Sequence, residues 1–295
     1  MKTILVIGGS GVIGSKLVKY FLDNNDNVEF TYLTNRPYFG KGTSLNISEK
    51  DRVLELVEML NPDVVIHTTA ITNVDFCEKN HAMADLIHVD GTANIIEGCK
   101  NTKSKLVYVS TSFVFDGKKR LYFEDDPISP ATYYGYTKAK GEEMVKKSNL
   151  SYLILRTDQP YCWTEKWQHT NSVLRVIQTL GENKILREVT DWYNNPTYVP
   201  DFVDATSKLI QEEMTGIFHL SGSDFISRYD WSLLVAEVFG LDKNLLVPIT
   251  SDTLNLAAKR VNVNLSNEKI FQKTGIKMKD LRSGLEDMFK SRESI

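Results

Sequence analysis

The sequence of 295 residues has few cysteines and no excess of charge of one sign. Its cysteines, Cys77, Cys99 and Cys162, are far apart and not in CxxC spacing, so neither a disulfide framework nor a zinc site is expected. Lys and Arg number 35 against 38 Asp and Glu, a net charge of −3, which gives no basic excess for a nucleic-acid backbone. We therefore expect no bound metal and no nucleic-acid partner.

A long apolar run is also missing. The opening apolar segment, Ile4 to Ile7, runs directly into Gly8 and Gly9, and no segment approaches the ~20 apolar residues of a membrane span. Apolar residues make up 42% of the chain and charged residues 25%, the balance of a globular protein with a sizeable core. We expect a cytoplasmic protein without a membrane partner, built as two lobes or as one large α/β body.

Short apolar segments alternate with longer amphipathic segments through the first half of the chain. The apolar segments are rich in Val, Ile and Leu, which is typical of parallel strands buried on both faces. This alternation predicts an α/β fold with a doubly wound parallel sheet covered by helices on both faces. The expected order is strand 3–7, helix 12–21, strand 28–33, helix 50–60, strand 63–67, helix 82–100, strand 106–110, helix 135–147 and strand 152–155.

The pattern changes after about residue 156. A polar, aromatic stretch contains Tyr161, Trp163 and Trp167, whose rings suit either packing between lobes or stacking on a nucleobase. No internal repeat or low-complexity linker follows, so we expect the later lobe to interleave with the first. The elements expected in it are a helix at 172–180, a strand at 216–220 and helices at 231–239 and 281–289.

A glycine-rich loop joins the first predicted strand to the first predicted helix. Gly8, Gly11 and Gly14 form a GxxGxxG pattern. One glycine allows the sharp turn, the next allows backbone N–H groups to approach a pyrophosphate, and the third allows close packing of helix on sheet. Because the positive end of the helix dipole then faces the anion, the pattern predicts a dinucleotide site.

The end of the second predicted strand indicates which dinucleotide binds. An NAD site places an acidic residue there for the ribose 2′-hydroxyl, whereas a 2′-phosphate requires a cation. Residues 32–37 contain no Asp or Glu but do contain Arg36, whose guanidinium suits a phosphate. We therefore expect NADP(H), with NAD(H) as the alternative. The competing interpretation of Arg36 is that it is only a surface charge on a loop.

A tyrosine and a lysine lie four residues apart at the start of the helix predicted at 135–147. The tyrosine comes just before this range and the lysine lies within it. Tyr134 and Lys138 share one helix face, and a nearby ammonium brings the pKa of a phenol, ordinarily ~10, closer to useful acidity. The hydroxyl residues 110–112 end the preceding strand, where they can orient a substrate carbonyl. Tyr136 and Lys140 have the same spacing on another face, so spacing alone leaves both pairs open.

These features together resemble the extended short-chain dehydrogenase/reductase family, and within it the dTDP-4-dehydrorhamnose reductases. The resemblance runs through nearly the whole chain in the same order. The segments that carry it are the glycine loop, 61–67 (NPDVVIH), 74–78 (VDFCE), 110–117 (STSFVFDG), 134–142 (YGYTKAKGE), 195–198 (NPTY), 227–229 (SRY) and 256–260 (LAAKR).

The resemblance implies a Rossmann-type lobe and a smaller mixed α/β lobe that closes on a nucleotide-sugar. Residues 1–157, with a returning segment near 191–222, are expected to bind the dinucleotide, and residues 158–190 and 223–295 the substrate. The implied reaction reduces the C4 ketone of a nucleotide-linked 4-keto-6-deoxy sugar with NADPH, as from dTDP-4-dehydrorhamnose to dTDP-rhamnose. A homodimer is the expected assembly.

The resemblance also assigns residues. Its YGxTK pattern selects Tyr134 as proton donor and Lys138 as the group that lowers the tyrosine pKa and holds the ribose, with Thr111 positioning the carbonyl. The dinucleotide is expected against Gly8, Ser10, Gly11, Val12, Ile13, Gly14, Asn35, Arg36, Asn46, Ile47, Thr69, Ala70, Tyr134 and Lys138. The substrate is expected against Gln159, Asn171, Asn195 and Arg260.

Other chemistries within this superfamily lack their residues here. Dehydratases need an acid pair after the strand-end hydroxyl, where this chain has Ser112 and Phe113. Epimerases with a tightly held NAD usually have the ribose-binding acid that the second strand lacks. An epimerase stays an alternative, as does a non-catalytic NADP-binding regulatory subunit similar to the methionine adenosyltransferase beta subunit. Asp90, where relatives have asparagine, and Gln159, where they often have tryptophan, are departures that leave room for another substrate or role.

Overall fold

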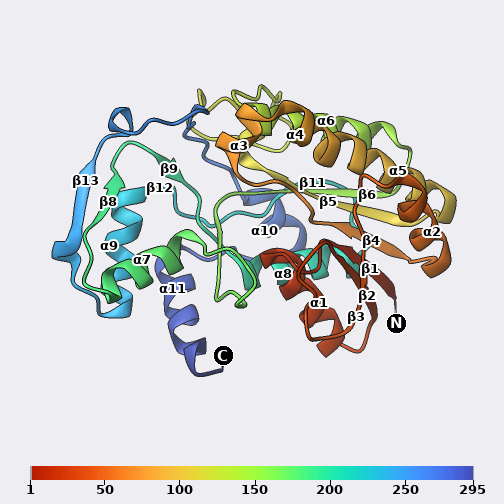
Figure 1. Cartoon of the computed structure of the whole chain (residues 1–295), viewed down its shortest axis with the longest axis horizontal. Coiled ribbons are helices and arrows are strands. Elements are labelled where there is room, and N and C mark those ends of the chain that lie inside the picture. Colours follow the sequence, from red (N-terminus) through yellow and green to blue (C-terminus); the bar gives the residue numbers. More distant parts are fainter. Residues whose placement is uncertain (1, 295) are drawn as a thin grey trace.

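Within residues 2–294, which the computed structural model describes, seven parallel strands form one central sheet (Figure 1). Each strand pairs with its neighbours in parallel, and the order reverses at β1, so the sheet is doubly wound. The predicted fold class is therefore confirmed. In spatial order the strands are β3 (Lys41–Ser44), β2 (Asn27–Tyr32), β1 (Thr3–Ile7), β4 (Val64–His67), β5 (Lys105–Thr111), β6 (Tyr152–Thr157) and β11 (Gly216–His219).

Strand β1 shows why helices cover both faces. Successive side chains of a strand point to opposite faces, and in β1 all four that follow Thr3 are apolar and buried. Ile4 and Val6 belong to a core with α1 and α8, whereas Leu5 and Ile7 belong to a core with α2, α5 and α6. These helices are α1 (Val12–Asp23), α8 (Val199–Gln211), α2 (Lys50–Leu60), α5 (Gly91–Thr102) and α6 (Tyr133–Lys147).

Several elements on the sheet side differ from the sequence expectation. The helix α8, which packs on the sheet together with α1, was not predicted. The edge strand β3 was not predicted, because its short sequence KGTS is polar and largely exposed. The helix expected over 82–100 is interrupted: α4 (His81–Asp85) passes through a π-helical turn at Leu86–Asp90 before α5 begins. Such turns are frequent at functional sites, and this one turns His88 into the interior.

A separate apolar core lies at one end of the sheet (Figure 1). Trp231, Val235 and Leu285 are among its buried residues, and small strand pairs flank it. The predicted bounds of the two lobes stay a prediction. The remaining elements are α3 (Val74–Lys79), α7 (Ser172–Gly181), α9 (Arg228–Phe239), α10 (Glu268–Thr274), α11 (Leu281–Lys290), and the pairs β7 (Pro160–Tyr161) with β10 (Thr197–Tyr198), β9 (Tyr193–Asn194) with β12 (Ile226–Ser227), and β8 (Leu186–Val189) with β13 (Leu246–Ile249).

A search of the described helices found none with the length and apolar character that crossing a membrane requires.

Candidate functional site

Two neighbouring cavities lie at the carboxyl ends of the sheet strands. The larger, about 650 Å³, is lined by residues that follow β1, β4 and β6 and by the end of β5. The smaller, about 210 Å³, is lined by residues that follow β1, β2, β3 and β4. Both include Ser10, Gly11, Thr68 and Ala70, so they adjoin at the point where the strand order reverses. Ligands bind at this place in doubly wound sheets.

The glycine loop forms the floor shared by the two cavities. Gly8 has a φ of +90°, and a Cβ on Gly14 would lie 2.2 Å from the Gly8 carbonyl oxygen, so neither position accepts a side chain. No side chain within residues 2–292 caps the amino end of α1 at Gly11. The first N–H groups of this twelve-residue helix are thus left for an anion in the cavity.

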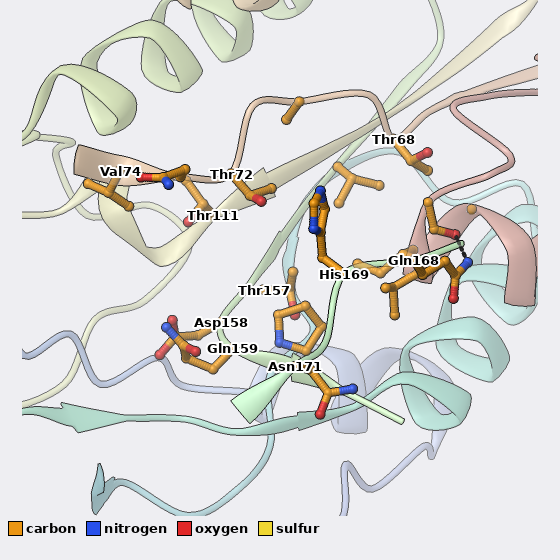
Figure 2. Close-up of a pocket in the computed structure, with 18 of the residues that line it drawn as sticks. Thr68, Thr72, Val74, Thr111, Thr157, Asp158, Gln159, Gln168, His169 and Asn171 are labelled. Carbon is orange, nitrogen blue, oxygen red and sulfur yellow. Dashed lines mark hydrogen bonds between the residues drawn. The ribbon is translucent and has the colours of Figure 1, made fainter. Parts of the chain in front are cut away.

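Residues 163–171, here called the strap, cross over this loop. The Gln168 amide donates hydrogen bonds to the carbonyl oxygens of Ser10 (3.0 Å) and Gly11 (3.1 Å), and the Trp167 indole donates to Ser10 (3.2 Å). Because the strap uses carbonyl oxygens, it leaves the first N–H groups of α1 available, whereas the amides of Gly8, Gly9 and Gly11 are already bonded within the chain. Figure 2 shows Gln168 against the start of α1 and His169 projecting into the larger cavity. An ion pair between Glu165 of the strap and Lys19 of α1 adds a second attachment.

The structure distinguishes the two tyrosine–lysine pairs. Tyr134 and Lys138 are buried and line the larger cavity, whereas Tyr136 is 44% exposed and Lys140 is exposed. The geometry therefore brings the first pair to the site, as the family resemblance implies. The α6 helix that carries it begins where the Thr132 side chain accepts a hydrogen bond from the Gly135 amide.

Burial dominates the acidity of the Tyr134 phenol. It raises the pKa of Tyr134 well above the ordinary value, a hydrogen bond with the Thr111 side chain lowers it in part, and the nearby Asp158 carboxyl raises it further. Tyr134 therefore holds its proton at neutral pH. Thr111 ends β5 beside Thr157 of β6, and Figure 2 shows both on the same side of the cavity as Asp158. Tyr134 lines the same cavity, so a hydroxyl, a phenol and a carboxyl meet at this edge of the sheet.

The Lys138 ammonium contacts groups other than the Tyr134 phenol, and its predicted effect on the tyrosine pKa stays a prediction. Its Nζ donates to the Val109 carbonyl oxygen at 2.9 Å and lies 4.0 Å from the centre of the Tyr108 ring. Burial lowers the pKa of Lys138 to about 7, although the Glu142 carboxylate opposes this shift. A lysine that titrates near neutrality can hold or release a proton at Nζ under physiological conditions.

His88 is a buried neighbour of this pair that sequence reasoning missed. Its Nε2 accepts from the Ile71 amide (2.8 Å), so the ring proton is on Nδ1, which faces the Thr137 hydroxyl at 2.7 Å. Burial and the charge of Lys138 lower the pKa of His88 to about 3. Asp90, the departure noted in the sequence, is exposed on the π-helical turn instead. Only the π-helical turn brings His88 inward, and a regular helical pattern does not show it.

Most of the residues predicted to bind the dinucleotide reach the cavities. Arg36 does not line either cavity; it is exposed beside Asn35, which does. The larger cavity is lined by Ser10, Gly11, Val12, Ile13, Gly14, Asn35, Ala70, Tyr134 and Lys138. The smaller is lined by Gly8, Ser10, Gly11, Asn46, Ile47, Thr69 and Ala70.

The residues predicted to contact the substrate divide into three groups. Gln159 lines the larger cavity and keeps donors free. Asn171 and Arg260 also line it, but Asn171 caps α7 by accepting from the Leu174 amide (3.1 Å), and Arg260 is paired with Asp75.

Asn195 needs a correction, because it lies outside both cavities. Its side-chain NH₂ group donates to the Asp224 carbonyl (2.9 Å) and the Asn264 side chain (3.1 Å), while its oxygen accepts from the Leu265 amide (2.9 Å). Both donors of this side chain are used within the protein, and it does not reach either cavity.

Asp158 is a further lining residue that the sequence did not single out. It is buried, and its carboxyl accepts hydrogen bonds from the Ser112 hydroxyl (3.0 Å), the Asn195 amide (2.9 Å) and the Asn194 side chain (3.2 Å). Burial raises its pKa although these hydrogen bonds lower it. Ser112 occupies the position where a dehydratase has an acid, and here its hydroxyl donates a hydrogen bond to the Asp158 carboxyl in the cavity wall.

Comparison with known proteins gives consistent matches. A sequence profile described as the RmlD substrate binding domain matches residues 1–294. The dTDP-4-dehydrorhamnose reductase of Aggregatibacter actinomycetemcomitans is 30% identical over 98% of each chain. Methionine adenosyltransferase 2 subunit beta of Pongo abelii is 28% identical over 91% of this chain and 81% of its own. The crystal structure of dTDP-4-dehydrorhamnose reductase from Bacillus anthracis in complex with NADP is 25% identical, with a TM-score of 0.88 over 98% of this chain and 99% of that one.

Proposed function

The chain belongs to the RmlD substrate-binding domain family, and on this premise we propose that it is an NADPH-dependent reductase of nucleotide-linked 4-keto-6-deoxy sugars. The proposed reaction reduces the C4 ketone, as from dTDP-4-dehydrorhamnose to dTDP-rhamnose. One observation carries the proposal: Thr111, Tyr134 and Lys138 line the same cavity as the glycine loop. A dinucleotide and a carbonyl substrate in that cavity would therefore meet beside a proton donor.

The residues present fit a dinucleotide. The uncapped N–H groups at the start of α1 suit a pyrophosphate, and a Cβ at Gly14 would close the cradle. The smaller cavity, which ends at Asn46 and Ile47, suits the adenosine half. Arg36, exposed in the loop that follows β2, carries a guanidinium that suits a 2′-phosphate, and this supports NADP over NAD. When bound, the reduced nicotinamide supplies the hydride for this chemistry.

The side chains of this chain supply the proton. Tyr134, kept protonated by burial, donates from its Oη to the oxygen of the carbonyl as negative charge develops there. The Thr111 hydroxyl, which lines the cavity with Tyr134, orients the same oxygen. Lys138 Nζ, with a pKa of about 7, holds a proton close to this pair and binds ribose hydroxyls. The strap crosses the glycine loop, to which the Gln168 amide attaches it.

The direct test follows loss of NADPH absorbance on mixing with enzymatically prepared dTDP-4-keto-6-deoxy sugars. Tyr134→Phe should lower kcat by about 10²–10⁴-fold, the usual contribution of a positioned acid, and this loss should be far larger than any weakening of NADPH binding. Tyr136→Phe is the matched control, because this exposed tyrosine lies two residues further along the same helix, and its rate should equal that of the unmodified protein. No turnover of any sugar by protein that binds NADPH would refute the proposal.

A regulatory subunit is the second candidate, favoured by the similarity to methionine adenosyltransferase 2 subunit beta over 91% of the chain. In that case the NADP site would stabilise a surface for a partner enzyme, and Tyr134→Phe would have no effect. Affinity purification of the tagged protein distinguishes the two functions. A stoichiometric partner enzyme, together with no reductase activity, would support the regulatory role.

A further inference from the structure

Gln159 has an unusual backbone conformation at the wall of the larger cavity. Its φ is +41°, in the left-handed region that residues other than glycine rarely adopt. Its carbonyl oxygen accepts from the Thr197 amide at 3.2 Å, which helps to hold this conformation. Strained residues of this kind gather at ligand sites, where the surrounding structure maintains them. The conformation of Gln159 thus suggests that its side chain has a role in ligand binding.

The hydrogen bonds of Gln159 fix the orientation of its amide. Arg228 Nη1 lies 3.1 Å from Oε1, and a guanidinium has only donors, so the oxygen must face Arg228. The amide nitrogen therefore points away from Arg228. Nε2 makes no hydrogen bond to any described residue, yet it is not among their buried unpaired polar atoms, so it is open to the cavity that Gln159 lines. Gln159 thus presents two N–H donors to a ligand.

Arg228 is built to hold this amide in place. It is 8% exposed, its Nη2 donates to the Ser172 hydroxyl at 2.7 Å, and its guanidinium lies 5.3 Å and 4.6 Å from the ring centres of Trp192 and Trp231. No carboxylate within residues 2–292 forms an ion pair with it. Burying a cation without such a partner is costly, so its retention beside the cavity needs a reason. Fixing Gln159 supplies one.

The position of Gln159 indicates which part of a ligand it meets. It follows Thr157, the β6 residue that pairs with Thr111 of β5, so it lies at the reacting end of the cavity and not at the phosphate loop (Figure 2). The hydrogen bonds of the Arg228 guanidinium go to Gln159 and Ser172, so the group that this part of the wall presents to the cavity is the neutral amide of Gln159. A neutral N–H donor at this place suits an uncharged oxygen, such as a sugar hydroxyl.

We propose that Gln159 is a substrate-specificity residue that donates a hydrogen bond to a hydroxyl of the hexose, and that Arg228 is the positioning residue that orients its amide. This inference rests on the proposed function and deepens it. Sugars that carry the hydroxyl are favoured over their deoxy counterparts, because the counterpart leaves a desolvated N–H unpaired. The proposal predicts a preference at a sugar position other than the reacting C4.

The experiment compares pairs of nucleotide-linked 4-ketohexoses that differ by one hydroxyl, at C2, C3 or C6. In one pair the unmodified protein should show a kcat/KM ratio of about tenfold or more, equivalent to ~1.4 kcal/mol. Gln159→Leu should abolish that ratio by raising KM for the hydroxylated sugar alone, with unchanged NADPH affinity. Arg228→Met should reduce the ratio in part. Gln178→Leu, the same change at an exposed position of α7, is the control and should keep it.

Binding separates this inference from the proposed function. The same ratios are measured as Kd values by calorimetry with the Tyr134→Phe protein loaded with NADP, which needs no turnover. If the unmodified protein reduces none of the sugars but Gln159→Leu still abolishes a binding preference, the reductase proposal fails and the specificity role stands. A ratio that is the same in Gln159→Leu and the unmodified protein for every pair, or no binding of any of these sugars, overturns the inference.

Discussion

At the scale of single residues, the glycines of the loop have different tasks. A Cβ on Gly11 would meet only the Gly8 carbonyl, at 3.3 Å, whereas one on Gly14 would overlap that oxygen at 2.2 Å. Gly11→Ala should therefore fold normally but lose at least about tenfold in NADPH affinity, ~1.4 kcal/mol, because the methyl stands where a phosphate approaches. Gly14→Ala should lose about 1–3 kcal/mol of stability through overpacking. Thermal denaturation and NADPH titration check both, and normal NADPH affinity in Gly11→Ala would place the pyrophosphate elsewhere.

Lys138 gives a prediction about pH. Its pKa is about 7 in the folded protein and ~10.4 in an unfolded chain, so between these values the unfolded state binds the extra proton and stability rises with pH. Below pH 7 the folded state bears the full cost of the buried charge. Lys138→Met should thus be inactive but more stable than the unmodified protein at pH 6. Each kcal/mol of added stability should raise Tm by about 2–4 °C. The difference in Tm should become smaller toward pH 10.

The control for this change is Lys140→Met, on the exposed face of the same helix, where Tm should barely change. Thermal denaturation from pH 6 to pH 10 measures both variants. A Lys138→Met protein that is less stable at pH 6 would mean that the hydrogen bond from Nζ to the Val109 carbonyl outweighs the cost of burial.

The individual site residues differ in how far sequence predicts them. Tyr134 and Lys138 follow from helical spacing, and the glycine loop follows from its place between a strand and a helix. Spacing could not choose between the two tyrosine–lysine pairs, because the choice depends on which face of α6 meets the sheet; only the family resemblance selected one. Asp158 and Arg228 were missed because their partners lie 36 or more residues away along the chain. Long-range hydrogen bonds of this kind leave no local pattern.

At the scale of elements, the strap is held by separate interactions, and each of them can be removed by a single substitution. Glu165 and Gln168 attach it to α1 and the glycine loop, and a bound dinucleotide would lie beneath it. Glu165→Gln and Gln168→Ala should each speed NADPH dissociation several-fold, and together by about tenfold, ~1.4 kcal/mol. Stopped-flow displacement of NADPH by excess NADP measures these rates.

Glu143→Gln is the matched control for the strap variants, because it breaks an exposed ion pair with Lys147 on α6, away from the site. Its dissociation rate should equal that of the unmodified protein. Unchanged rates in the double strap variant would show that the dinucleotide leaves without opening the strap.

The elements also show where sequence reasoning reached its limit. The buried strands β1, β4, β5 and β6 were predicted because continuous apolar runs mark them. The edge strand β3 has no such run, since Lys41 to Ser44 is held by backbone pairing with β2 and faces solvent. The π-helical turn at Leu86–Asp90 was predicted as regular helix, because the His88 ring in it contacts Thr137, 49 residues away, which leaves no local sequence pattern.

At the scale of the whole molecule, one ion pair joins the two sides of the cavity. Asp75 on α3 pairs with Arg260 of the later half and accepts a hydrogen bond from the Ala258 amide at 2.8 Å. Burial raises the pKa of Asp75, but these contacts lower it more, so it stays below the ordinary value. The pair therefore contributes stability above pH ~3.9, and this contribution is lost as pH falls through the folded-state pKa.

Asp75→Asn should lower the stability by about 1–3 kcal/mol, because a hydrogen bond to a charged group is lost and Arg260 is left without its partner. The Tm difference should be full from pH 5 to pH 8 and should close below pH ~4, following the sign given by the lowered pKa. Because Arg260 lines the larger cavity, KM for the nucleotide-sugar should rise while NADPH affinity stays unchanged. Glu143→Gln, which breaks an exposed pair, should change stability by less than about 0.5 kcal/mol. Two results would contradict this prediction: equal losses of stability in Asp75→Asn and Glu143→Gln, or a loss of NADPH affinity in Asp75→Asn. Either would mean that the Asp75–Arg260 pair does not link the stability of the fold to substrate binding.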